Sequence, residues 1–206
     1  LLIQLRKATL EFLLIQAHHM GITKLTNEQV DFLKSEYPNL NYDLGKNAIN
    51  GILSFNLKFG DEGETIIDEY QIEIELNFVS DLGIPIVRET GNRIIEIAKN
   101  KNIPPADLHL NNQNGEMCII IPPKTKERYP NGFDLKILLE HIQEHLYWVS
   151  YYEKYDKAPW KEYGHGELGY LELYLENKEK YSNEFKTYFR CNSRPEFRRK
   201  IKELKK

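Results

Sequence analysis

Cys118 is the residue whose type and sequence context best fit covalent chemistry. It ends a stretch rich in Asn and Gly that begins at His109, so we expect its thiol to be accessible from a loop. The side-chain amide of Asn111 can donate a hydrogen bond to a developing oxyanion. Glu116 disfavours the thiolate form, and no Lys or Arg lies within several residues of the thiol. This pattern predicts a cysteine that receives an already activated acyl group rather than one that attacks an amide.

A second thiol, Cys191, has a different chemical setting. Arg190 and Arg194 lie close to it in the sequence, and nearby positive charge favours the nucleophilic thiolate form. By local charge alone, Cys191 is the more reactive of the two thiols. A structural alternative also stays open for Cys118, because free cysteines are among the most often buried residues.

Three histidines offer a different chemistry. His141 and His145 are four residues apart in a predicted helix, a spacing that can chelate a metal ion, and His165 would complete a three-histidine site. Such a site would make the chain a metal-dependent hydrolase. However, two histidines at the polar edge of a helix are common without a metal, and no carboxylate motif accompanies these. We therefore predict no metal or other cofactor.

The position of Cys118 depends on an antiparallel sheet that the sequence indicates upstream of it. Residues 48–59 and 66–79 alternate apolar and polar side chains with the period of two that half-buried strands show. Residues 60–63 between them predict a hairpin turn. A third strand is predicted at 84–89, at an edge of the sheet because it contains Pro85.

Helices are predicted before and after these strands. The strongest pattern covers residues 133–155, with Asp134 as its cap. Its predicted buried face consists of apolar residues at helical spacing, namely Leu135, Leu138, Leu139, Ile142, Leu146 and Val149. Other helices are predicted at 4–20, after Thr26, near 94–99, and at about 167–180, 182–190 and 195–205. Helices, an antiparallel meander, a long irregular stretch and further helices together indicate the α+β class.

Charge is unevenly distributed along the chain. The net charge is −3, but residues 186–206 carry nine Lys and Arg against two Glu, which leaves about −10 for the rest by subtraction. Such a basic end predicts either a surface for an acidic or protein partner or a solvated helix on its own domain. Aromatic residues between Tyr147 and Tyr174 could stack nucleic-acid bases, but we interpret them as the contacts that hold the C-terminal helices to the body of the protein.

The composition does not suggest a membrane protein. Hydrophobic residues make up 41% and charged residues 29% of the chain. No window approaches the roughly 18 unbroken apolar residues of a membrane helix. The first residues lack the charge order of a secretory signal, and the two cysteines do not suggest a disulfide framework. We therefore expect a cytoplasmic protein.

The stretch from His109 to Cys118 resembles the active-site signature of ubiquitin-conjugating (E2) enzymes. In that signature a His-Pro-Asn triplet is followed, across a short turn with Asn-Gly, by a cysteine in an apolar run. Leu110 replaces the proline here, and the spacing from histidine to cysteine is shorter than usual. The resemblance covers residues 48–155. It implies a UBC-like fold in which Cys118 accepts the acyl group, Asn111 donates to the oxyanion, and His109 holds the loop.

Three further stretches resemble a narrower branch, the lone bacterial E2-like proteins encoded beside cyclic-oligonucleotide synthases in anti-phage (CBASS) operons. They are residues 89–93, the pair Asp107 and His109, and residues 159–170. This resemblance implies that the chain conjugates the C-terminus of the synthase rather than ubiquitin. Some of these relatives end in a cysteine-rich metal-binding tail, and Cys191 is interpreted as its remnant. A non-catalytic E2 variant is the alternative from another class.

The resemblance also divides the chain into three parts. They are N-terminal helices over 1–47, a UBC-like catalytic core over 48–155, and a C-terminal helical extension with a basic tail over 156–206. The expected partners are a protein donor with an activated C-terminus and a separate activating enzyme, because no nucleotide-binding motif is visible. Neither a membrane nor nucleic acid is expected as a partner.

Overall fold

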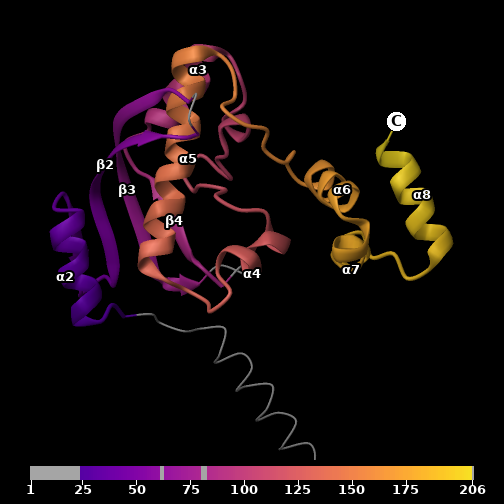
Figure 1. Cartoon of the computed structure of the whole chain (residues 1–206), viewed down its shortest axis with the longest axis horizontal. Helices are drawn as coiled ribbons and strands as arrows, with labels where there is room; N and C mark the ends of the chain where they lie inside the picture. The colour runs from indigo at the N-terminus through magenta and orange to yellow at the C-terminus, as the bar shows by residue number, and fades with distance from the viewer. Residues whose placement is uncertain (1–23, 61–62, 80–82, 206) are drawn as a thin grey trace, which may run out of the picture. The chain divides into compact units, whose positions relative to one another are not determined.

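The computed structural model describes residues 24–60, 63–79 and 83–205 (Figure 1). The predicted helix at 4–20 and part of the predicted turn at 60–63 lie outside this range. The chain divides into two compact units. Unit 1 comprises the residues up to Ile119 together with Thr125–Pro159, and unit 2 comprises Ile120–Lys124 and the residues from Trp160 onward.

Unit 1 contains a four-stranded antiparallel sheet with the order β1-β2-β3-β4. The strands are β1 (Leu40–Asp43), β2 (Ala48–Lys58), β3 (Thr65–Val79) and β4 (Pro85–Glu89). Each strand pairs with the next one along the chain, so the sheet is a meander. The three predicted strands are confirmed. The prediction of helices over 1–47 is incomplete, because β1 lies within this range; its residues do alternate apolar and polar side chains, but four residues are the shortest run that gives this signal.

The two faces of the sheet follow the predicted period of two. Leu53 of β2 and Ile72 and Ile74 of β3 are fully buried. By contrast, Ile52 is 42% exposed and Ile67 is 74% exposed. Alternate side chains therefore form one continuous apolar face for a helix to cover.

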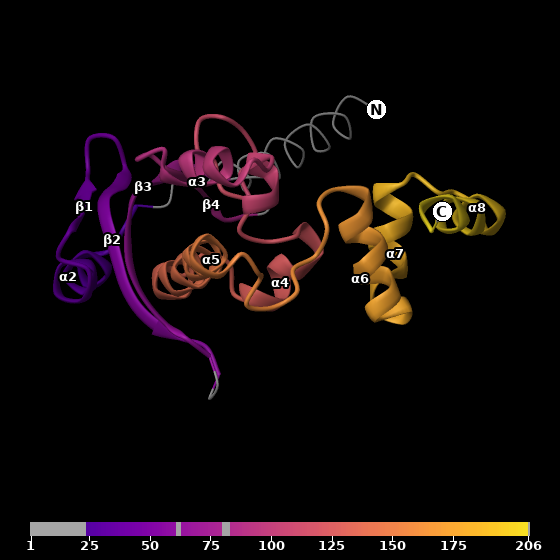
Figure 2. The same cartoon turned by 90° about the horizontal axis from the view of Figure 1, so that it is seen from above.

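Helix α5 (Leu135–Tyr155) covers the apolar face of the sheet (Figure 2). Asp134 caps it as predicted, since its carboxylate accepts a hydrogen bond of 3.0 Å from a backbone N–H in the first turn. All six apolar residues of the predicted helix face are buried. A buried hydrogen bond of 2.8 Å between the hydroxyls of Tyr70 and Ser150 fixes the helix on β3.

Shorter helices complete unit 1. Thr26 begins α2 with a capping box in which it exchanges hydrogen bonds with Gln29, so the predicted helix start is confirmed. The remaining elements of unit 1 are α2 (Asn27–Glu36), α3 (Arg93–Lys101), the 3-10 turn η1 (Pro105–Leu108) and α4 (Thr125–Arg128).

Unit 2 consists of the 3-10 turn η2 (Pro122–Lys124) and three helices, α6 (Glu167–Glu176), α7 (Lys178–Tyr188) and α8 (Arg194–Leu204). The prediction of one helix over 167–180 is wrong at its end. Asn177 ends α6 and its side chain caps α7 by accepting from the backbone N–H of Lys180. An Asn side chain competes with the helical backbone in this way, which favours a break.

The core of unit 2 is aromatic. Phe185 is 1% exposed, and its ring centre lies 5.2 Å from those of Tyr174 and Phe197. These three residues come from α7, α6 and α8, so aromatic side chains hold the three helices of unit 2 together.

The described residues therefore have the predicted α+β architecture of an N-terminal helix, a four-stranded meander and several C-terminal helices. Within these residues, no helix combines the length and apolarity needed to cross a bilayer.

Candidate active site

Residues 109–118, here called the Cys118 hairpin, form a short antiparallel loop. The backbone N–H of Asn111 donates to Glu116 O at 2.8 Å, and that of Cys118 donates to His109 O at 2.7 Å. Leu110 and Met117 form an isolated bridge between these two bonds. The cysteine therefore has a fixed backbone position.

The Cys118 hairpin is also hydrogen-bonded to the edge strand β4. Glu89 donates its N–H to Gly115 O at 2.8 Å, and Met117 donates its N–H to Val87 O at 2.9 Å. Gly115 is required at the contact. Its φ is +78°, and a Cβ atom there would lie 2.0 Å from the carbonyl oxygen of Glu89. The Asn-Gly of the sequence thus lets the loop approach the sheet closely.

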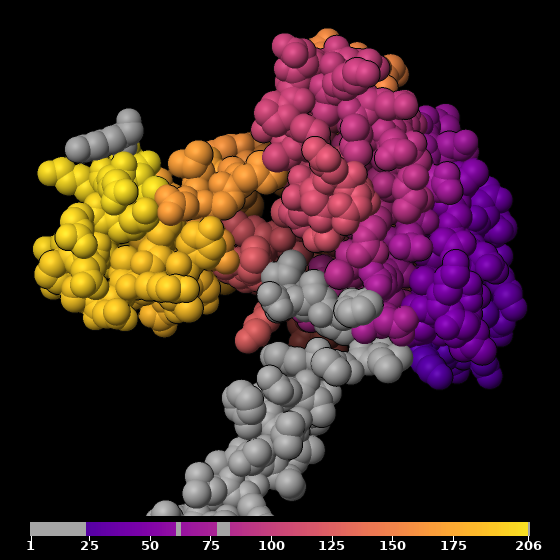
Figure 3. Space-filling view, turned by 180° about the vertical axis from the view of Figure 1, so that it is seen from behind, coloured from indigo at the N-terminus to yellow at the C-terminus, as the bar shows by residue number. Residues whose placement is uncertain are grey.

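The two faces of the Cys118 hairpin differ in burial. Leu110 and Met117 are each 4% exposed and belong to the core, whereas Asn111 is exposed and Cys118 is half-exposed. Asn111 and Cys118 are diagonal neighbours on the same face of the ladder, a relation with a typical Cα separation of roughly 7–8 Å. The pink-to-salmon residues of this region reach the surface of unit 1 in Figure 3.

The tip of the Cys118 hairpin is organised by Asn side chains around Glu116. The carboxylate of Glu116 accepts hydrogen bonds of 3.1 Å from the side-chain amides of both Asn111 and Asn112. Asn112 Oδ1 accepts from the backbone N–H of Asn114 at 3.1 Å, so Asn112 stabilises the turn of the hairpin. The Asn111 amide has two N–H groups, and its contact with Glu116 needs only one.

His109 anchors the start of the Cys118 hairpin. It adopts a left-handed conformation with φ of +61° and is 9% exposed. Its ring packs edge-on against two rings of α5. The ring centres are 5.0 Å apart for Trp148 and 5.3 Å apart for His145. This geometry suits a positioning residue more than a general base at the surface.

The two α5 histidines, His141 and His145, are held in the neutral form by burial. Burial, followed by the charge of Arg128, lowers the pKa of His141 to about 4, and Tyr129 hydrogen-bonds its Nδ1 at 2.8 Å. Burial also lowers the pKa of His145 well below its ordinary value, with His109 and His141 adding to the effect. In the described part of the chain, no three His, Cys, Asp or Glu side chains are placed to hold a metal ion. His165 belongs to unit 2, whereas His141 and His145 belong to unit 1.

The stretch at 89–93 supports β4 and α3. The buried Glu89 carboxylate accepts from the backbone N–H groups of Gly91 at 2.7 Å and Ile94 at 3.2 Å, and burial raises its pKa. Arg93 forms ion pairs with Asp68 and Glu153. Residues 89–93 thus fix β4, the strand to which the Cys118 hairpin is hydrogen-bonded.

The other stretches of the narrower resemblance lie at η1 and, from Trp160 onward, in unit 2. Asp107 is an exposed residue of η1. In unit 2, a Cβ atom on Gly169 would lie 2.1 Å from the carbonyl oxygen of Gly164, so the glycines of this stretch permit a close turn before α6.

Cys191 lies in unit 2, in the connection between α7 and α8. It is half-exposed, and its Sγ lies 3.7 Å from the carbonyl oxygen of Phe189. Neither cysteine is in a disulfide bond. The two candidate thiols therefore belong to separate units.

No protein-family model, curated protein or solved structure matches this chain.

Sequence reasoning missed the supports of the site. The contacts of His109 with α5 and of Tyr129 with His141 join residues far apart in the chain. The one local signal was the spacing of His145 and Trp148, which places them three residues apart on one face of α5.

Proposed function

We propose that this chain is an E2-like conjugating enzyme with a UBC-like fold, in which Cys118 carries an acyl group as a thioester. The observation that carries the proposal is a half-exposed cysteine at the end of a loop that backbone hydrogen bonds hold to a sheet edge. Such a thiol is accessible and fixed in place, which suits acyl transfer.

The proposed reaction has two steps. Cys118 Sγ attacks the carbonyl carbon of a donor thioester, a new C–S bond forms, and the donor's thiol leaves with the proton. A lysine amine then attacks the Cys118 thioester, an amide forms, and the cysteine thiol is released. Both steps pass through an oxyanion that the Asn111 amide can stabilise once it turns from Glu116.

The order of elements supports the proposal. A meander, an irregular stretch ending in Cys118 and a long helix follow one another, as in the enzymes that the sequence resembles. The donor in our proposal is the C-terminus of a cyclic-oligonucleotide synthase in bacterial anti-phage defence. A separate enzyme activates this C-terminus. The protein then works in the cytoplasm, with no cofactor of its own.

The test uses a synthetic peptide with a C-terminal thioester as the activated donor. Intact-mass spectrometry should detect one peptide on the full chain, and the adduct should disappear with a reducing thiol. Added free lysine should convert the adduct to a peptide–lysine amide. A chain that forms no adduct and no amide would instead be a non-catalytic binding module on the same fold.

A further inference from the structure

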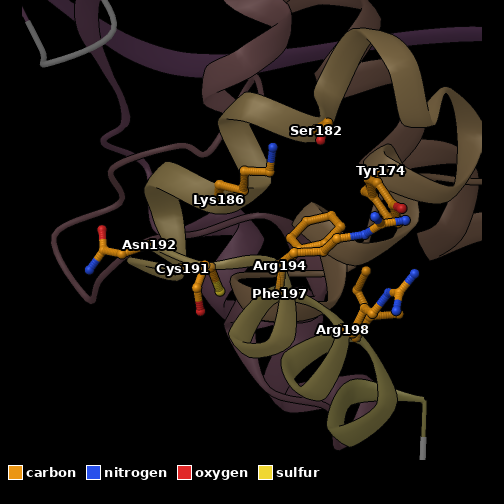
Figure 4. A pocket seen from close by; sticks show the side chains of 10 residues that line it. Tyr174, Ser182, Lys186, Cys191, Asn192, Arg194, Phe197 and Arg198 are labelled. Atoms are coloured by element: carbon orange, nitrogen blue, oxygen red, sulfur yellow. The ribbon is translucent and has the colours of Figure 1, made fainter.

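Unit 2 contains a pocket that the proposed acyl transfer does not use. Its volume is about 530 Å³, and its walls come from α6, α7, α8 and the α7–α8 connection (Figure 4). This volume is within the range of roughly 300–1,000 Å³ that small-molecule sites occupy. The pocket is thus large enough for an organic ligand.

The charge of the pocket walls is entirely positive. Lys186, Arg194 and Arg198 line it, and none of its lining residues is Asp or Glu. Within the described residues these three side chains form no ion pair, whereas Lys200 of the same helix α8 pairs with Glu167 at 3.3 Å. Three cations around one cavity without a carboxylate favour a ligand with several negative charges.

The neutral walls add hydrogen-bonding and apolar surface. Ser182 contributes a hydroxyl, while Tyr174 and Phe197 contribute aromatic surface. Lys186 Nζ lies 5.5 Å from the centre of the Phe197 ring, so a cation and an aromatic surface meet in the same cavity. This combination suits a phosphorylated organic molecule better than a bare inorganic ion.

The site depends on side chains rather than on the N-terminus of α8. Glu196 already accepts hydrogen bonds from the backbone N–H groups of Asn192 and Ser193 in a capping box. The charged donors for a ligand are therefore the side chains of Lys186 and the two arginines. Arginine donates in a planar fork that matches phosphate oxygens.

We propose that this pocket binds an oligophosphate-bearing small molecule, such as a nucleoside polyphosphate, through Lys186, Arg194 and Arg198. This inference is independent of the acyl-transfer function, because all the residues involved belong to unit 2.

Cys191 provides a reporter, because it lines the same pocket. In the full-length Cys118→Ala variant it is the one remaining thiol of the two in the chain. Alkylation of Cys191 by iodoacetamide is followed by intact mass with ATP, with pyrophosphate, or with sodium chloride at matched ionic strength. A bound polyphosphate excludes the reagent and disfavours the thiolate. Near-saturating ligand should therefore slow alkylation by about fivefold or more relative to chloride.

The two anions distinguish the source of the phosphate. Slowing by both ATP and pyrophosphate indicates recognition of the oligophosphate itself, and slowing by ATP alone indicates recognition of a nucleotide. Either result supports the proposal. If neither anion slows alkylation more than chloride does, the proposal is wrong.

Matched variants separate the pocket from the general charge of α8. Arg194→Gln and Arg198→Gln should each raise the ATP concentration that gives half-maximal protection by about tenfold, because each removes a charge-assisted contact. Arg199→Gln removes the same charge from the next residue of α8, which does not line the pocket, and should retain protection. Equal losses in Arg198→Gln and Arg199→Gln would overturn the assignment. Protection in the parent protein tests the proposal without these variants.

Discussion

The surroundings of the two cysteines differ: backbone hydrogen bonds fix the position of Cys118, whereas cationic side chains surround Cys191. Around Cys118, backbone hydrogen bonds to β4 and buried contacts with α5 fix the position of the thiol, and the nearest charged side chain in sequence is acidic. Around Cys191, exposed cationic side chains on helices set the charge. Local sequence alone favours Cys191 as the reactive thiol, whereas our proposal assigns acyl transfer to Cys118 because its backbone position is fixed. The comparison teaches that a fixed position and a favourable local charge are separate contributions to the reactivity of a cysteine thiol.

The largest expected effect is the loss of acyl transfer when each thiol is removed in turn. Cys118→Ala should abolish the peptide–lysine amide, because no thioester can form at the hairpin. Cys191→Ala should leave the yield of amide unchanged. Intact-mass spectrometry with the peptide thioester and free lysine measures both. The reverse outcome would assign the chemistry to the cationic pocket instead.

The second expected effect concerns Asn111. Asn111→Ala should slow transfer to lysine by about 10²–10³-fold, the usual effect of losing one oxyanion donor. The melting temperature should change little, since Asn111 is exposed. The measurement is single-turnover decay of the Cys118 thioester with lysine.

Asn114→Ala is the matched control for this variant. It changes an exposed Asn of the same hairpin whose side chain has no proposed role in transfer. A sharp fall in melting temperature with unchanged transfer per folded molecule would make Asn111 a structural turn residue.

The third expected effect is a loss of stability in acid that is specific to unit 1. The pKa of His141 is lowered to about 4 in the folded protein, whereas an unfolded chain has an ordinary histidine pKa of about 6.5. Between these values the unfolded chain takes up the proton and the folded chain does not. Stability is therefore full above about pH 6.5 and falls as the pH drops toward about 4, by at most about 3 kcal/mol for this residue.

Denaturant titrations at pH 7 and pH 4.5 measure this loss. His141→Gln should reduce the difference between the two pH values, because the glutamine does not titrate. His165→Gln, in unit 2, should retain it. Identical pH dependence in the parent and in His141→Gln would show that the buried histidine does not control acid stability.

The fourth expected effect is the release of the Cys118 hairpin from β4. Gly115→Ala adds a methyl group 2.0 Å from the carbonyl oxygen of Glu89 at a φ of +78°. The cost is about 1–3 kcal/mol through local strain. Hydrogen exchange at Glu89 and Met117 should accelerate, and thioester formation at Cys118 should become slower.

Gly132→Ala separates crowding from backbone strain. Gly132 has a similar φ of +84°, but a Cβ atom there has no neighbour within 4 Å. It should leave the hydrogen bonds of the hairpin intact. Equal effects of the two variants on Cys118 would mean that contact with β4 does not fix the thiol.

The difference between the two regions also explains how much the sequence could predict. The long strands β2 and β3 and the buried face of α5 follow regular periods, so local patterns were sufficient. The strand β1 has four residues, the shortest run that shows alternation, and the break at Asn177 depends on the cap that one side chain provides. Within the site, Cys118 and Asn111 stood out by residue type and spacing. The support of the hairpin by Glu89 and the α5 histidines depends on tertiary contacts that no local pattern contains.

The smallest expected effect on Cys118 comes from damage to unit 2. Phe185 is 1% exposed and contacts aromatic residues from the other two helices of the unit. Phe185→Ala should therefore destabilise α6–α8 by about 3–5 kcal/mol. Cys191 should then be alkylated faster, because local opening exposes the α7–α8 connection. Thioester formation at Cys118 should stay within about twofold of the parent, since Cys118 belongs to unit 1 and Phe185 to the core of unit 2.

Leu146→Ala is the mirror experiment, because Leu146 is a fully buried residue of α5 in unit 1. It should weaken the contact of α5 with the sheet by about 2–5 kcal/mol and reduce acylation of Cys118. Alkylation of Cys191 should not change. Parallel rates of the two thiols, one acylated by the peptide thioester and one alkylated by iodoacetamide, then form a double comparison. If Phe185→Ala lowers the rate of Cys118 acylation as much as Leu146→Ala does, the two units unfold together. Cys118 and Cys191 would then belong to a single cooperative structure, and their surroundings could not be compared as separate regions.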